Sequence, residues 1–190
     1  MTARPISMCK QREGECMTDP SQFKPKTVYV TYIASTPEKV WQALTDPQFS
    51  RQYFAGFAID VEPKTGGALH YRYPDGRTHI SGKVLEWSPP RRFVCTWTVE
   101  GMEDFRQLPE CIVAYDIEQA GDAVKLTMTE SHSWDIPDAI MAGGQSGWPA
   151  ILSNLKSVLE TGKPMAIAMA LPEGFMEAVR RAVAEKPWKS

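Results

Sequence analysis

The chain has 190 residues, 43% of them hydrophobic, and a formal net charge of −2. This length and composition suit one globular domain with a sizeable core and some segments outside it. Binding to nucleic acid is disfavoured because the 21 basic residues do not outnumber the 23 acidic ones. A membrane span is disfavoured because no apolar run approaches the roughly 20 residues that cross a bilayer.

Residues 1–25 are expected to form a polar leader outside the core. The leader lacks the apolar stretch of a secretory signal. The chain has four cysteines, Cys9, Cys16, Cys95 and Cys111, and they form no CxxC pair. We therefore expect reduced thiols in a cytoplasmic protein, with Cys95 and Cys111 acting as small core residues.

Residues 27–54 predict a strand that runs directly into two short helices. The first eight residues alternate between two faces and are rich in β-branched and aromatic types, as in a strand. Thr36 and Pro37 then provide a hydroxyl N-cap and a proline at the first helical position. Asp46 and Pro47 repeat this start signal, so the helix is expected to break and begin again.

The middle of the chain predicts an antiparallel meander. Apolar alternation is interrupted by short turns rich in Gly, Pro and Asp, such as Pro74-Asp75-Gly76. With the strand near the start of the chain, the pattern predicts about seven strands, over residues 26–34, 57–62, 68–73, 79–87, 92–99, 111–117 and 124–130. Such even spacing with tight turns favours consecutive strands that pair with each other.

Two helices are expected after the strands. Residues 148–161 carry one apolar stripe that must be buried on a sheet face, and Gly162 and Pro164 end the helix. A second helix is expected over residues 172–186. Its apolar side must cover either its own domain or a second copy of the chain, and we predict a homodimer through this extension.

The order of these elements resembles the START-like or helix-grip superfamily. Within it, the branch named for the activator of heat-shock protein 90 ATPase is similar over residues 27–163. The segments that carry the resemblance are ASTPEKVWQALTDP, Gly66-Gly67, GKVLEWSPPRRFVCTW, DIEQAGDAVKLTMTES and GWPAILSNLKSVLETGK. The resemblance implies an α+β fold with a curved antiparallel sheet wrapped around a long C-terminal helix. It divides the chain into the leader, a domain over 26–163 and an extension over 164–190.

START-like domains hold small apolar molecules between the sheet and the long helix, so the resemblance implies a cavity lined by one parity of each strand. The candidate ligand-binding residues are Tyr71, Tyr73, Trp97, Tyr115, Met128, Glu130 and Trp134. A buried phenol or indole needs a hydrogen-bond partner, which a ligand can supply. Glu130 continues this inward parity although it carries a carboxylate, and the simplest interpretation is that it reaches water at the end of its strand.

Other polar clusters predict less. If Asp75-Gly76 is a two-residue turn, Arg72 lies opposite His79 on the outer face, where a guanidinium would repel a cation. His132 and Asp135 could form an acid–base pair before the last helix, but no nucleophile motif accompanies them. Residues 143–147 are glycine-rich and are expected to form a connector or hinge.

We interpret the chain as a single-domain protein that binds a small apolar or aromatic molecule, with no cofactor and no metal. The first alternative is a protein-interaction module, as in a co-chaperone. The second is an enzyme of cyclase or hydrolase type that uses Glu130 or His132. An open cavity with either side chain pointing into it would favour the enzyme.

Overall fold

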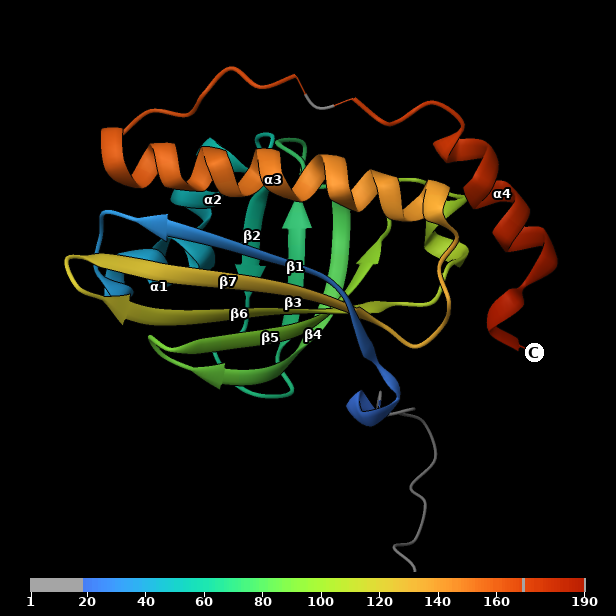
Figure 1. The fold of residues 1–190 in the computed structure, drawn as a ribbon, viewed down its shortest axis with the longest axis horizontal. Helices are drawn as coiled ribbons and strands as arrows, with labels where there is room; N and C mark the ends of the chain where they lie inside the picture. Colours follow the sequence, from blue (N-terminus) through green and yellow to red (C-terminus); the bar gives the residue numbers. More distant parts are fainter. Residues whose placement is uncertain (1–18, 169, 190) are drawn as a thin grey trace, which may run out of the picture.

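The computed structural model describes residues 19–168 and 170–189 and has the α+β architecture expected from the sequence. Seven antiparallel strands form one sheet in the order β1-β7-β6-β5-β4-β3-β2. The sheet curves beneath the long helix α3, which crosses it from end to end (Figure 1). The strands are β1 (Lys24–Ile33), β2 (Ala58–Val61), β3 (Ala68–Arg72), β4 (Thr78–Ser88), β5 (Arg92–Val99), β6 (Cys111–Ala120) and β7 (Ala123–His132).

Within the described residues, four α-helices accompany the sheet: α1 (Pro37–Thr45), α2 (Pro47–Tyr53), α3 (Asp138–Thr161) and α4 (Phe175–Glu185). Short 3-10 turns lie at Pro20–Gln22, Phe105–Gln107 and Pro187–Lys189. In the part of the chain that the structure describes, none of the helices combines the length and the apolar character that a bilayer crossing requires. Most of the predicted leader, residues 1–18, lies outside the described residues.

The predicted start signals of α1 and α2 are confirmed. The Thr36 hydroxyl accepts a hydrogen bond from the Lys39 backbone N–H, and Pro37 is the first residue of α1. Asp46 caps α2 in the same way, with its carboxylate 2.7 Å from the Gln48 nitrogen. Because each cap satisfies backbone donors that a helix leaves unpaired, local sequence alone determines where these helices begin.

The main core lies between the concave face of the sheet and helices α1, α2 and α3. The inward parity predicted for the strands is confirmed, since its aliphatic and aromatic members are almost fully buried: Leu69, Ile80, Val84, Phe93, Val113, Leu126 and Met128 are all 2% exposed or less. From α3, Leu155 enters this core with no exposed surface. The sheet and helix therefore bury their apolar faces against each other, as a two-layer fold requires.

The turn between β3 and β4 is one residue longer than predicted, and as a result the His79 side chain does not lie on the outer face where it was expected. The Tyr73 N–H donates to the Arg77 carbonyl, and Gly76 has φ 87°, so three residues form the loop. Arg72 pairs with Thr78 while Tyr71 pairs with Ile80, which leaves His79 as the extra residue of a bulge. The predicted pairing of Arg72 with His79 is wrong, and the His79 ring instead stacks on Phe57.

Helix α3 begins at Asp138, ten residues before the predicted start at residue 148. The predicted hinge over residues 143–147 is therefore wrong, because these residues form helical turns. Glycine and proline lower helix propensity, and Pro149 lies inside the helix, but tertiary contacts outweigh this local preference. Asn154, a polar residue of this helix, is buried, and its side-chain oxygen accepts a hydrogen bond from the Met165 N–H.

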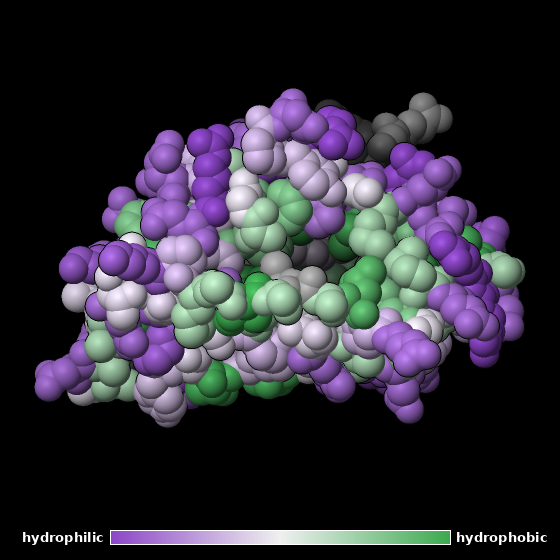
Figure 2. All heavy atoms as spheres, turned by 90° about the horizontal axis from the view of Figure 1, so that it is seen from above, coloured by the Kyte–Doolittle hydropathy of each residue, from purple (hydrophilic) through white to green (hydrophobic). Residues whose placement is uncertain are grey.

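The C-terminal extension packs on its own domain. It runs back along α3 to place α4 beside the N-terminal end of that helix (Figure 1). Phe175, Val179 and Ala182 of α4 form a second core with Trp134 and Ile140. The apolar stripe of the tail helix is thus covered within the chain. Seen from above, hydrophobic residues also gather around a hollow on the face that carries α3 and the extension (Figure 2).

Candidate functional site

A cavity of about 260 Å³ lies between the sheet, the first half of α3 and the C-terminal extension. Its walls are mostly apolar and aromatic. They come from the ends of β5 and β7, the start of β6, the Phe105–Gln107 turn, α3 and α4. The lining includes Phe54, Trp97, Val99, Met102, Phe105, Leu108, Trp134, Ile136, Ile140, Trp148, Ile151, Leu171 and Phe175. Its polar side chains are Thr98, His79, Glu130 and His132, with the Cys111 thiol beside them.

Three glycines of α3 help to create this space, because Gly143, Gly144 and Gly147 all line the cavity. Each costs about 1 kcal/mol of helix propensity relative to alanine, so the helix keeps them for another reason. A Cβ atom at Gly147 would have no neighbour within 4 Å, whereas one at Gly143 would lie 2.2 Å from the Phe175 ring. Gly147 therefore leaves open space in the cavity, and Gly143 allows Phe175 of α4 to pack closely against α3.

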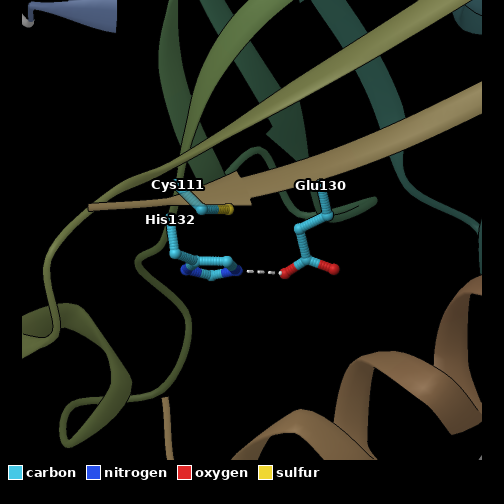
Figure 3. A group of neighbouring side chains, drawn as sticks. All are labelled: Cys111, Glu130 and His132. Carbon is cyan, nitrogen blue, oxygen red and sulfur yellow. Dashed lines mark hydrogen bonds and ion pairs between the residues drawn. The ribbon is translucent and has the colours of Figure 1, made fainter. Parts of the chain in front are cut away.

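A polar cluster forms one wall of the cavity. Glu130 and His132 are two residues apart on β7 and so share a face, and Cys111 starts the neighbouring strand β6. Figure 3 shows the three side chains converging, with the His132 ring and the Glu130 carboxylate pointing at each other. The Glu130 Oε1 lies 2.8 Å from His132 Nε2.

Glu130 does not depend on water at the strand end, because its carboxylate is hydrogen-bonded inside the protein. Its Oε2 accepts hydrogen bonds from the Trp148 Nε1–H at 2.8 Å and the Thr27 hydroxyl at 3.3 Å. The side chain is 13% exposed. A buried carboxylate is costly unless its lone pairs are satisfied, and these donors provide that satisfaction.

Two buried polar atoms of the lining have no hydrogen-bond partner within the described residues: Nδ1 of His132 and Nε1 of Trp134. Burial raises the pKa of the Cys111 thiol well above its usual value, and the negative charge of Glu130 acts in the same direction. The thiol is therefore protonated at neutral pH and is a poor nucleophile there.

The structure separates the sequence-predicted ligand-binding residues into two groups. Trp97, Glu130 and Trp134 line the cavity. The other four do not: Tyr71, Tyr115 and Met128 are buried deeper in the core, and Tyr73 is half-buried beside Phe57 and His79.

Sequence reasoning missed part of the polar wall and the contribution of the extension. His132 was expected in the loop before the last helix as a candidate acid–base residue, but it lies in β7 and continues the parity of Glu130 by one more step, a signal that could have placed it beside Glu130. The acid–base pair that His132 and Asp135 could have formed does not occur, because Asp135 is exposed and its carboxylate binds Lys26 Nζ at 2.8 Å. Cys111 and Phe175 reach the site only through strand pairing and helix packing, which no local pattern shows.

We expect acid to destabilise the fold partly through His79. This residue lines the cavity, its Nδ1 lies 2.9 Å from the Tyr73 hydroxyl, and burial lowers its pKa below 6.5. Because the pKa of His79 is lower in the folded state, the unfolded chain binds a proton more readily than the folded one. The contribution of neutral His79 to the free energy of unfolding is therefore complete above about pH 6.5, and it is lost as the pH falls through the lowered pKa of the folded state.

Chemical denaturation at pH 8 and pH 5 measures this effect. The loss of unfolding free energy between the two pH values should be smaller in His79→Gln than in the wild type. An equal loss in both proteins would show that His79 does not contribute.

Comparison with known proteins identifies similar sequences and structures. A family model described as activator of Hsp90 ATPase homolog 1-like protein matches residues 34–160. A comparison with curated proteins gave no match. The crystal structure of DynU16, a protein of the dynemicin biosynthetic locus, is similar with 26% identity and a TM-score of 0.61 over 72% of this chain and 48% of that one. This chain thus spans about half the length of DynU16.

Two further structures share the fold at lower identity. CalU16 from Micromonospora echinospora has 18% identity and a TM-score of 0.55, with 85% of each chain covered. The Aha1 dimer from Colwellia psychrerythraea has 20% identity and a TM-score of 0.56, with 72% of this chain and 96% of that one covered. Leu171 and Phe175 of the C-terminal extension, which line one side of the cavity, lie outside the family match.

Proposed function

The chain belongs to the family of activator of Hsp90 ATPase homolog 1-like proteins, and we propose that it binds a small apolar or aromatic molecule in the cavity between its sheet and α3. The observation that carries the proposal is the cavity itself, about 260 Å³ with mostly apolar walls. An apolar cavity of about 150 Å³ holds benzene, so this one has room for a fused or substituted ring.

An unpaired indole N–H in the cavity lining favours a ligand with at least one oxygen. The Trp134 Nε1–H is a donor only, is buried and has no partner within the described residues. An unsatisfied buried donor costs about 1–3 kcal/mol, which a ligand hydroxyl or carbonyl oxygen would recover. Small-molecule sites commonly combine apolar walls with a few polar groups that orient the ligand.

Titration with 1-naphthol tests the proposal. Native mass spectrometry comes first, and any co-purifying molecule is extracted and identified, because it would occupy the cavity. Three tryptophans, Trp97, Trp134 and Trp148, line the space, so the bound naphthol should change tryptophan emission in a saturable manner at one equivalent. A linear, non-saturating change with ligand-free protein would contradict the proposal.

A second candidate is an enzyme that moves a proton, because Glu130 and His132 both line the cavity and lie within hydrogen-bond distance of each other. A carboxylate–imidazole pair beside a bound carbonyl compound can act as acid and base. Deuterium exchange next to the carbonyl of 1-tetralone in D₂O tests this. Exchange that is lost in Glu130→Gln would support the enzyme, whereas equal exchange with and without protein would exclude this chemistry for the probe.

An interaction role rests on exposed apolar residues. Val28, Val30 and Tyr32 are more than half exposed along the edge strand β1. In the extension, Met165, Ile167 and Leu171 are also exposed, and they offer an apolar surface for the predicted homodimer, since the α4 stripe is covered. Light scattering of the full chain tests the dimer: twice the chain mass supports it, and the monomer mass of 21.3 kDa contradicts it.

A further inference from the structure

We propose that Cys111, Glu130 and His132 form a binding site for one zinc-like divalent ion in the wall of the cavity. One sulfur, one nitrogen and one oxygen from these side chains all lie within 4.8 Å of one another. The inference goes beyond the proposed binding of an organic molecule and does not depend on it, because the ion alone is the probe.

The strand register explains why three residues far apart in sequence converge. Ile112 pairs with Ser131 between β6 and β7, so their neighbours Cys111 and His132 approach each other at the strand ends. Glu130 lies two residues before His132 and therefore points to the same side. Figure 3 shows all three side chains on one side of the strand pair.

Only small movements would complete the site. A tetrahedral ion with bonds of about 2.0–2.3 Å holds its ligand atoms about 3.3–3.6 Å apart. The Glu130 Oε1 and His132 Nε2 atoms are 2.8 Å apart and would separate by about 0.5 Å. The sulfur lies within 4.8 Å of both atoms, so it would approach by at most about 1.2 Å, which a change in side-chain torsion can supply.

The donor types indicate which ion fits. A thiolate and an imidazole favour zinc and similar transition metals, whereas magnesium and calcium prefer oxygen ligands. Three protein ligands leave a fourth position open, as in catalytic zinc sites, and here it would face the cavity that all three residues line. When sulfur binds, the thiol proton leaves to solvent. Two anionic ligands then neutralise the ion, which lowers the cost of holding it beside a mostly apolar cavity.

Outer contacts already orient the carboxylate. The Trp148 Nε1–H and the Thr27 hydroxyl both donate to Glu130 Oε2, while the partner of Oε1 is His132, the other proposed ligand, so Oε1 can turn to an ion that both residues bind. Metal sites commonly fix their carboxylate ligands in this way. A nucleophilic Cys–His pair fits less well, because the imidazole Nε2 faces Glu130 and the thiol is 7% exposed.

Cobalt binding, followed by absorption spectroscopy, tests the site directly, because thiolate ligation produces a charge-transfer band in the near ultraviolet. The reduced, chelator-treated full chain is used together with Cys9→Ser/Cys16→Ser, which leaves Cys95 and Cys111 as the thiols. Both proteins should bind one equivalent of Co²⁺ with the band, and Zn²⁺ should displace it. A missing band in the double variant would overturn the proposal.

Single substitutions in that background assign the ligands. Cys111→Ser should abolish the band, while the matched control Cys95→Ser, which removes an equally buried core thiol, should keep it. His132→Gln should weaken Co²⁺ binding at least about tenfold, and Trp148→Phe, which removes an outer donor, by about 10–100-fold. If Cys111→Ser fails to fold by circular dichroism, His132→Gln decides: binding within twofold of the parent would overturn the site.

Discussion

Leu155→Asp is expected to leave the protein unfolded at 25 °C. Leu155 has no exposed surface and lies where α3 meets the concave face of the sheet. Removing a buried leucine costs about 2–5 kcal/mol, and burying an unpaired carboxylate adds several more. Together these terms approach the whole stability of a typical domain, about 5–15 kcal/mol.

Circular dichroism and a thermal melt measure the effect of Leu155→Asp. Gln145→Asp provides the control, because it introduces the same residue at an exposed position of the same helix. The control should melt within a few degrees of the wild type. A cooperative melt of Leu155→Asp close to that of the wild type would show that α3 does not rest on the sheet as described.

Gly147→Leu is expected to abolish the binding of 1-naphthol while the fold persists. Gly147 lines the cavity, and a Cβ atom there would meet nothing within 4 Å, so a leucine side chain has space to enter it. Leucine also raises the helix propensity of α3 by close to 1 kcal/mol relative to glycine. The melting temperature should therefore not fall, which separates blocking of the cavity from unfolding.

Gly147→Ala is the matched control for this experiment. It makes the same change in helix propensity but adds one methyl group, so most of the cavity remains. The tryptophan-emission titration should show binding in the wild type and Gly147→Ala and none in Gly147→Leu. Equal naphthol affinity in all three proteins would place the binding elsewhere.

Local signals in the sequence were sufficient for the caps and for the strand faces. Thr36 and Asp46 each satisfy donors within three residues, so the start of α1 and α2 needs no tertiary information. The inward parity of Phe93 and Cys95 follows from alternation with a period of two. These elements depend on contacts that lie close in the chain.

The longer-range features could not be read in this way. The first ten residues of α3 contain Gly143, Gly144 and Gly147, which predict a loop, and only packing on the sheet and α4 makes them helical. His79 turned inward because one extra residue entered the β3–β4 loop, and a shift of one residue exchanges the two faces of a strand.

The alternation of inward and outward side chains also could not show which inward residues reach the cavity, because it does not give the position of the cavity along the strands. Tyr115, Met128 and Glu130 all share the inward parity, yet of these three only Glu130 reaches the cavity. The difference is position along the strand, since Glu130 lies near the end of β7. Cys111 joins it through the pairing of β6 with β7, and the intervening chain gives no spacing that indicates a shared site.

The most direct test of the proposed ligand-binding cavity follows the indole N–H signals of the tryptophans by NMR during addition of 1-naphthol. Trp97, Trp134 and Trp148 line the cavity, whereas Trp41 and Trp87 pack against each other and Phe93 in another part of the core. We expect the first three signals to shift together and saturate, while those of Trp41 and Trp87 stay in place. Shifts confined to Trp41 and Trp87, or no shift at all, would contradict a ligand site between the sheet and α3.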